Sequence, residues 1–191
     1  MDFSNLEVAA TKYPINLITL YDNYEETYYT MVYNLNGSTI NEEQIKRHLD
    51  YADDCKFKIF VFEKEQDMLK ALQRQLDELD PNIVTGWNSD GFDFPFLKAR
   101  YDFLGIPYVN KYGGGINLRT YQKEGVVYTD AELKFMYALD YMRLYKEMSF
   151  GKRESYSLGF ISKFELGVTK LELEDHMDDV FNEDINKFIA Y

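Results

Sequence analysis

The chain has 191 residues, of which 46% are apolar and 17% aromatic, so it can bury a sizeable core and is neither a disordered nor a collagen-like chain. With 21 basic and 33 acidic side chains, its formal net charge of −12 disfavours binding to nucleic acid by electrostatic attraction alone. A single cysteine and two histidines that lie far apart argue against a disulfide framework or a zinc site.

The first half of the chain shows strand patterns followed by a strong helix pattern. Two β-branched and aromatic runs flank a polar stretch, which predicts an antiparallel hairpin. Further on, apolar residues recur every three or four positions and predict an amphipathic helix, which Asp80-Pro81 ends. The expected elements are a hairpin (15–21 and 28–34), a loose helix (41–54), a strand (57–62) and the amphipathic helix (64–79).

The second half interleaves short strands and helices, which predicts an α/β layered fold. No linker or repeat divides the sequence, so we expect residues 1–191 to form a single domain. The expected elements are a strand (83–85), a helix (93–105), a second hairpin (112–130), a strand that ends at Asp140 (135–139) and three short helices (142–148, 157–164 and 182–191).

No apolar run approaches the roughly 20 residues of a membrane helix, and the first residues lack the pattern of a signal peptide. We therefore expect a cytoplasmic protein without a membrane partner.

The stretch NIVTGWNSDGFDFPFL, residues 82–97, concentrates the candidate functional residues. A short apolar strand ends at a glycine, and a polar, aromatic loop then leads into a helix. Because ligands gather at the carboxyl ends of strands in open α/β sheets, Asn88, Asp90, Phe92 and Asp93 are candidate site residues.

Two structural interpretations of this stretch stay open. Spacing alone favours Asp93 as the N-cap of the helix, because aspartate suits that position and Pro95 suits the first helical turn. The alternating Phe92, Phe94 and Phe96 are more typical of a core than of a binding platform.

The string Gly86-Trp87-Asn88, followed by Phe92-Asp93 and Pro95-Phe96-Leu97, resembles the second exonuclease motif of family B DNA polymerases. That motif is an asparagine, three variable residues and then Phe-Asp. Three further segments resemble the family in the same order. Their sequences are most similar to polymerases of T-even-like phages. These segments are residues 13–22 (YPIN to YD), 139–146 (LDY to LYK) and 155–170 (SYSL to ELG and a lysine).

The resemblance implies a 3′–5′ proofreading exonuclease domain with an RNase H-like fold, a mixed sheet flanked by helices, in a DNA-directed DNA polymerase. It implies that Asp93 is a catalytic residue that binds one of two divalent metals, Mg²⁺ or Mn²⁺. It implies that Asn88 and Phe92 contact nucleic acid. The implied partners are the single-stranded 3′ end of DNA and the remaining polymerase segments, in the cytoplasm of a phage-infected host.

Parts of the family pattern are missing. No Asp-x-Glu pair, the first motif, occurs in residues 1–14, and Tyr191 resembles the tyrosine of the third motif, whose aspartate would follow the chain end. We therefore expect a partial domain, either truncated or one piece of a split polymerase, that is inactive alone and lacks the first strand. The resulting unpaired sheet edge predicts self-association.

Several roles stay open at this point. The hairpin expected at residues 114–130 lies where phage members carry a strand-separating hairpin, but a plain surface hairpin is as compatible with its sequence. Asp140 and Lys170 match family positions and are interpreted as a buried structural aspartate and a surface lysine. The alternative functions are a non-catalytic single-stranded nucleic-acid-binding module and an interaction module without DNA contact.

Overall fold

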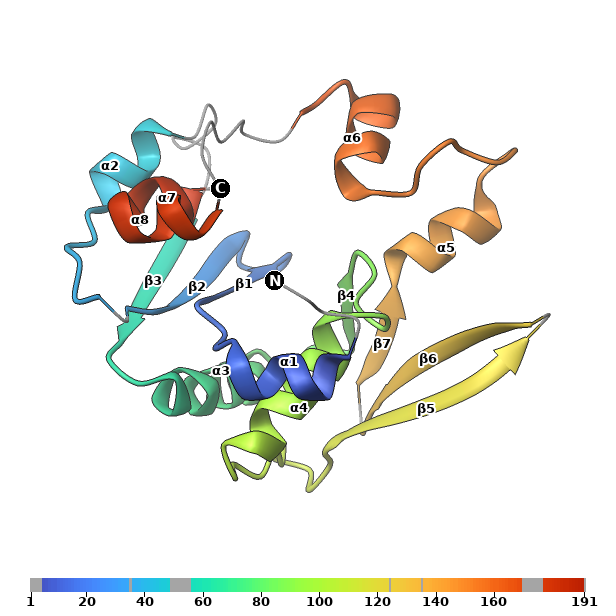
Figure 1. The fold of residues 1–191 in the computed structure, drawn as a ribbon, viewed down its shortest axis with the longest axis horizontal. Coiled ribbons are helices and arrows are strands. Elements are labelled where there is room, and N and C mark those ends of the chain that lie inside the picture. Colours follow the sequence, from blue (N-terminus) through green and yellow to red (C-terminus); the bar gives the residue numbers. More distant parts are fainter. Residues whose placement is uncertain are drawn as a thin grey trace. The chain divides into compact units, whose positions relative to one another are not determined.

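The computed structural model describes residues 5–34, 36–48, 56–123, 125–134, 136–169 and 177–190. They form a mixed α/β structure that divides into two compact units (Figure 1). One unit comprises Met1–Pro14 and Leu69–Ile161, and the other comprises Ile15–Met68 and Ser162–Tyr191. None of the helices within the described ranges combines the length and the apolar composition that a bilayer crossing requires.

The Ile15–Met68 unit is built on a three-stranded mixed sheet. Its strands are β1 (Leu17–Asp22), β2 (Thr27–Tyr33) and β3 (Lys56–Phe62). The central β2 runs antiparallel to β1 and parallel to β3. The hairpin and the following strand expected from the sequence are therefore present, because their β-branched and aromatic residues suit a pleated, half-buried surface.

Three short helices pack near this sheet: α2 (Glu42–Arg47), α7 (Met177–Glu183) and α8 (Ile185–Ala190). Val32 of β2 packs with Phe181 and Ile185 in a common apolar core. The expected helix over 41–54 is shorter than predicted, and residues 49–55 lie outside the described ranges. The single helix expected over 182–191 is also wrong. The Asp184 carboxylate accepts the N–H of Asn186 and caps a separate helix.

The other unit contains two helices that the fold places side by side, α1 (Leu6–Lys12) and α4 (Asp93–Phe103) (Figure 1). The guanidinium of Arg100 in α4 donates to the carbonyl of Ala10 in α1, and Ala10 is fully buried. The sequence did not predict α1, because seven residues are too few for a clear apolar period. The amphipathic helix is confirmed as α3 (Glu65–Leu79), which belongs to this unit from Leu69 onward.

The rest of this unit consists of short strands followed by helices. Strand β4 (Ile83–Gly86) pairs in parallel with β7 (Tyr137–Asp140), and β5 (Ile116–Lys123) pairs with β6 (Val126–Leu133) in a long antiparallel hairpin (Figure 1). The expected second hairpin is thus formed and extends past residue 130. Ile116, Leu133 and Met136 form a core cluster against Phe94. Helix α5 (Tyr141–Met148) follows, and the unit ends at Ile161 within α6 (Leu158–Leu166).

Candidate functional site

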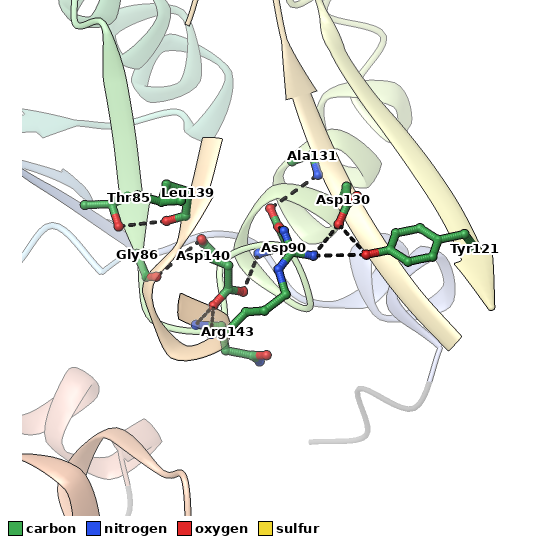
Figure 2. Close-up of polar contacts among 11 residues, drawn as sticks. Thr85, Gly86, Asp90, Tyr121, Asp130, Ala131, Leu139, Asp140 and Arg143 are labelled. Atoms are coloured by element: carbon green, nitrogen blue, oxygen red, sulfur yellow. Dashed lines mark hydrogen bonds and ion pairs between the residues drawn. The ribbon is translucent and has the colours of Figure 1, made fainter. Parts of the chain in front are cut away.

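The candidate site lies at the carboxyl ends of two paired strands. The register of β4 and β7 places Gly86 opposite Asp140, the last residue of each strand. The Thr85 hydroxyl donates to the carbonyl of Leu139 at 2.7 Å and adds a side-chain bond to this ladder. The loop after β4 and the helix after β7 therefore begin at the same edge of the strand pair (Figure 2).

Asp140 holds the loop after β4 to the start of α5. Its carboxylate accepts the backbone N–H groups of Asn88 at 3.3 Å, Asp90 at 3.1 Å and Arg143 at 3.1 Å. The bond from Arg143 makes Asp140 the N-cap of α5, and the residue is only 4% exposed. Asp140 is therefore a buried structural residue, as its sequence context predicts.

Asn88 turns the chain at the end of β4. Its φ of 64° lies in the left-handed region, which asparagine tolerates better than most residues. Its carbonyl accepts the N–H groups of Gly91 at 3.1 Å and Phe92 at 3.0 Å. A Cβ atom on Gly91 would come within 2.7 Å of the Asn88 Oδ1, so the amide lies tightly against this turn.

Trp87 contacts the elements after β7. Its indole N–H donates to the carbonyl of Tyr156 at 3.0 Å. Its ring lies 5.9 Å from the ring of Tyr145 and 6.3 Å from that of Tyr141, measured between centroids. The loop after β4 is thus held to α5 by aromatic packing as well as by Asp140.

Asp93 is the first residue of α4 and not its N-cap. Phe92 occupies the cap position and makes no side-chain capping hydrogen bond. The N–H of Phe94 is bound by the carbonyl of Ser89 at 3.0 Å, so a first-turn donor is already satisfied by the preceding loop. The capping interpretation of Asp93 is therefore wrong, and its carboxylate is left for another role.

The environment of Asp93 disfavours a bare negative charge. The residue is exposed to solvent as a whole, yet the protein around its carboxyl partly removes it from water, and this desolvation raises the pKa of the carboxyl. The nearby charge of Asp140 raises the pKa further, whereas the backbone N–H of Asp93 itself lowers it. A positive charge at this position would relieve the penalty.

The three alternating phenylalanines divide between core and surface. Phe96 is 8% exposed, and Phe94 packs against the apolar cluster below the hairpin. Phe92 is 36% exposed and lies parallel to the Phe96 ring, with centroids 5.8 Å apart. The core interpretation is confirmed for Phe96, whereas Phe92 presents part of its ring to solvent next to Asp93.

A polar network that the sequence analysis missed adjoins this loop. Arg143 of α5 forms ion pairs with Asp90 of the loop, at 3.1 Å, and with Asp130 of β6 (Figure 2). Asp90 is 4% exposed and also accepts the N–H of Ala131 at 3.2 Å. Asp90 therefore has a structural role in this loop. Its sequence context gives no sign of the ion pair, because Arg143 lies 53 positions away.

Two further residues singled out from the sequence lie outside the part of the chain that the structure describes. Tyr191, the candidate third-motif tyrosine, lies outside the described residues, as does Lys170. Within the described ranges, no cluster of three or more His, Cys, Asp or Glu side chains is arranged to hold a metal ion. Around this loop the carboxylates of Asp90 and Asp140 bind protein donors.

Comparison with known proteins gives a consistent family match. The family model described as "DNA polymerase family B, exonuclease domain" matches residues 9–161. The DNA-directed DNA polymerase of Escherichia phage RB69 is 28% identical over 200 residues, which cover 97% of this chain and 22% of that polymerase. The corresponding polymerase of Enterobacteria phage T4 is 25% identical over 212 residues, which cover 98% of this chain and 23% of that polymerase.

A shorter stretch matches a cellular polymerase. The DNA polymerase delta catalytic subunit of Bos taurus is 34% identical over 67 residues, covering 35% of this chain and 6% of that subunit. The chain therefore spans less than a quarter of the length of each of these relatives.

Proposed function

Because this chain belongs to the exonuclease-domain family of the family B DNA polymerases, we propose that it contributes to a 3′–5′ proofreading exonuclease. Such an enzyme hydrolyses mispaired nucleotides at the 3′ end of a DNA strand. The observation that carries the proposal is the position of Asp93, which is the first residue of α4 and directly follows Phe92, whose ring is partly exposed.

Asp93 is the proposed metal ligand and catalytic residue. Carboxylate oxygens suit hard divalent cations such as Mg²⁺ and Mn²⁺, and a pair of such ions stabilises both oxygens in a phosphodiester displacement. The donor set fits one such ligand, because the raised pKa of Asp93 reflects a charge that a cation would offset. Asp90 and Asp140 bind protein donors, and the described residues hold no cluster of three or more such side chains that could bind a metal ion, so the other ligands are proposed to come from the remaining polymerase segments.

Asn88 and Phe92 are the proposed contacts to the 3′ end of single-stranded DNA. The half-buried amide of Asn88 can donate to or accept from a base or a sugar, and the ring of Phe92 can stack on a base. Stacking does not require a positive surface, so it is compatible with a chain of net charge −12.

With Asp93 as the single proposed ligand, we expect the 191-residue chain to bind metal weakly and to hydrolyse little or no DNA by itself. The remaining polymerase segments are its proposed partners, and the host cytoplasm its proposed location. We also predict that residues 1–191 form a single, partial exonuclease domain that lacks the first strand of the fold.

Titration with Mn²⁺ tests the role of Asp93. In the wild-type chain, the paramagnetic ion should broaden the amide NMR signals of residues near Asp93 at lower concentrations than elsewhere. Asp93→Asn should abolish this preference, whereas Asp102→Asn, which alters an exposed carboxylate at the other end of α4, should preserve it. Equal broadening in Asp93→Asn and wild type would reject the proposed ligand.

Binding of a short single-stranded oligonucleotide tests the other two residues. Phe92→Ala should weaken binding by about 1–3 kcal/mol if the ring stacks on a base. Phe103→Ala removes an exposed ring at the opposite end of α4 and is the control. Asn88→Gly removes the amide while preserving the left-handed backbone, and unchanged affinity in this variant would reject the contact.

A non-catalytic single-strand-binding module is the second candidate. Two observations favour it. The carboxylates of Asp90 and Asp140 bind protein donors, and the ring of Phe92 is partly exposed. Under this alternative, oligonucleotide binding would be independent of Mn²⁺ and unchanged in Asp93→Asn.

A further inference from the structure

Arg143 connects two carboxylates that come from different segments of the chain. Its guanidinium pairs with Asp90, in the loop after β4, at 3.1 Å. The same guanidinium pairs with Asp130 in β6 and lies 3.5 Å from the hydroxyl of Tyr121 in β5, which in turn lies 3.3 Å from Asp130 (Figure 2). One side chain of α5 thus joins both strands of the hairpin to the loop.

The backbone of Arg143 reaches the same loop by a second route. Its N–H donates to Asp140, whose carboxylate also accepts the N–H groups of Asn88 and Asp90. A shift of Arg143 would therefore act on the loop through its own ion pair and through the carboxylate that orders the loop backbone. The two routes converge on the residues that precede Asp93.

The buried carboxylate of Asp90 is stabilised by the Arg143 guanidinium. Its side chain is 5% exposed, whereas the side chains of Arg143 and Asp130 are each 32% exposed. Burial raises the pKa of Asp90, and the charges of Asp130 and Asp140 raise it further, while the Ala131 N–H and Arg143 lower it. Removing the guanidinium would leave a buried carboxylate facing two others, an arrangement that is strongly unfavourable.

The N–H of Ala131 also joins the hairpin to Asp90, and the base of the hairpin is attached by apolar contacts. Ile116 and Leu133, paired at its base, pack with Met136 in the cluster that includes Phe94. The polar connection through Asp130 and Tyr121 lies further along the hairpin than this base. A displacement of the strands there would change the Arg143 contacts before it disturbed the core.

We propose that Arg143 is a positioning residue that couples the β5–β6 hairpin to the loop bearing Asn88 and Asp90 and leading to Asp93. The coupling itself is a property of the fold, and its relevance to catalysis rests on the proposed function. A hairpin held in place by a partner or by DNA would thereby stabilise the arrangement of the loop.

Amide hydrogen exchange in the 191-residue chain, followed by NMR, tests the coupling. Asp130→Asn removes the hairpin carboxylate without altering any residue of the loop. We expect it to lower the protection of the Asn88 and Asp90 amides by about tenfold. Asp130→Glu, which keeps the charge, should restore most of that protection. Glu132→Gln neutralises an exposed carboxylate of the same strand and should leave both amides unchanged.

A double-variant comparison assigns the effect to Arg143. Arg143→Lys keeps the charge but loses the fork that reaches both carboxylates, so it should also lower the protection of these amides. Adding Asp130→Asn to Arg143→Lys should produce no further loss, because both changes break one connection. Additive losses, or losses confined to the hairpin in Asp130→Asn, would refute the proposal.

The readout separates this inference from the proposed function, because exchange is measured without metal or DNA. Unchanged exchange at Asn88 and Asp90 would overturn the coupling even if Mn²⁺ bound at Asp93. Coupled exchange in a chain with no Mn²⁺ preference at Asp93 would support the coupling and reject the proposed function.

Discussion

Gly86 and Asp140 lie opposite each other at the carboxyl ends of β4 and β7, and this register determines what the Asp140 carboxylate can reach. From that position it accepts the N–H groups of Asn88 and Asp90, the second and fourth residues after Gly86. A shift of the ladder by one residue would turn Asp140 to the other face of the strand pair. The register of two four-residue strands therefore orders the candidate site.

Asp140→Ala should destabilise the protein more than most single substitutions. It would remove a helix cap and leave the N–H groups of Asn88 and Asp90 without their acceptor. Charged acceptors contribute about 1.5–3 kcal/mol, so we expect a loss of about 2–4 kcal/mol in the free energy of unfolding. Urea denaturation measures it. Asp102→Ala, which breaks an exposed pair with Lys98, is the control and should cost under about 1 kcal/mol.

Gly91→Ala should alter the site while leaving the fold stable. The added methyl group would meet the Asn88 Oδ1 at 2.7 Å, and this amide can rotate away at small cost. Oligonucleotide affinity should therefore fall if the Asn88 amide contacts DNA, while the melting temperature changes little. Gly159→Ala in α6 meets nothing within 4 Å and should stabilise that helix by up to about 1 kcal/mol. A large melting shift in Gly91→Ala would contradict the expected rotation.

The sequence was sufficient for the family, the α/β class and several elements. Four ordered segments resembled the exonuclease domain, and the family match over residues 9–161 confirms it. The mixed α/β structure is consistent with the predicted RNase H-like class. Helix α3 was predictable because Met68, Leu69 and Leu72 recur at helical spacing, and all three are buried.

The roles of individual carboxylates were harder to predict. Asp93 has the residue type and spacing of an N-cap, but the N–H of Phe96 that such a cap would serve is already bound by the carbonyl of Phe92, in the preceding loop. Whether a loop carbonyl reaches that donor depends on the left-handed turn at Asn88, which local propensity does not specify. The pairing of Arg143 with Asp90 and Asp130 likewise depends on the packing of the hairpin, which no local pattern encodes.

Self-association should involve the exposed face of the β4–β7 pair. Ile83, Tyr137 and Leu139 on these strands are 57%, 79% and 37% exposed, and Ile83 lies opposite Tyr137 in the ladder. An exposed apolar face on a short strand pair favours association with a second copy. Tyr137→Lys should therefore lower the weight-average mass measured by light scattering. Tyr24→Lys changes a more exposed tyrosine in the β1–β2 turn and is the control. A monomeric wild-type chain would exclude this association.

The raised pKa of Asp93 predicts that its carboxylate reduces stability at neutral pH. Between the ordinary value of 3.8 and the higher folded value, the folded state binds more protons than the unfolded state. The free energy of unfolding therefore falls as pH rises through this interval, and the loss is complete above the folded pKa. Desolvation of the carboxyl is the main cause, so a neutral side chain of the same shape should avoid the loss.

Asp93→Asn should accordingly melt about 1–2 °C above wild type at pH 7, and the difference should vanish below the ordinary aspartate pKa. Melting curves between pH 3 and pH 7 measure this difference, with Asp102→Asn as a control expected to show no such gain. Mn²⁺ should stabilise wild type and not Asp93→Asn, because only an ion that binds the folded state raises its melting temperature. A stability loss in Asp93→Asn at pH 7 would mean that the carboxylate accepts stabilising bonds in the fold. A gain in stability coupled to a loss of Mn²⁺ response would instead indicate a carboxylate retained for binding at a cost to folding.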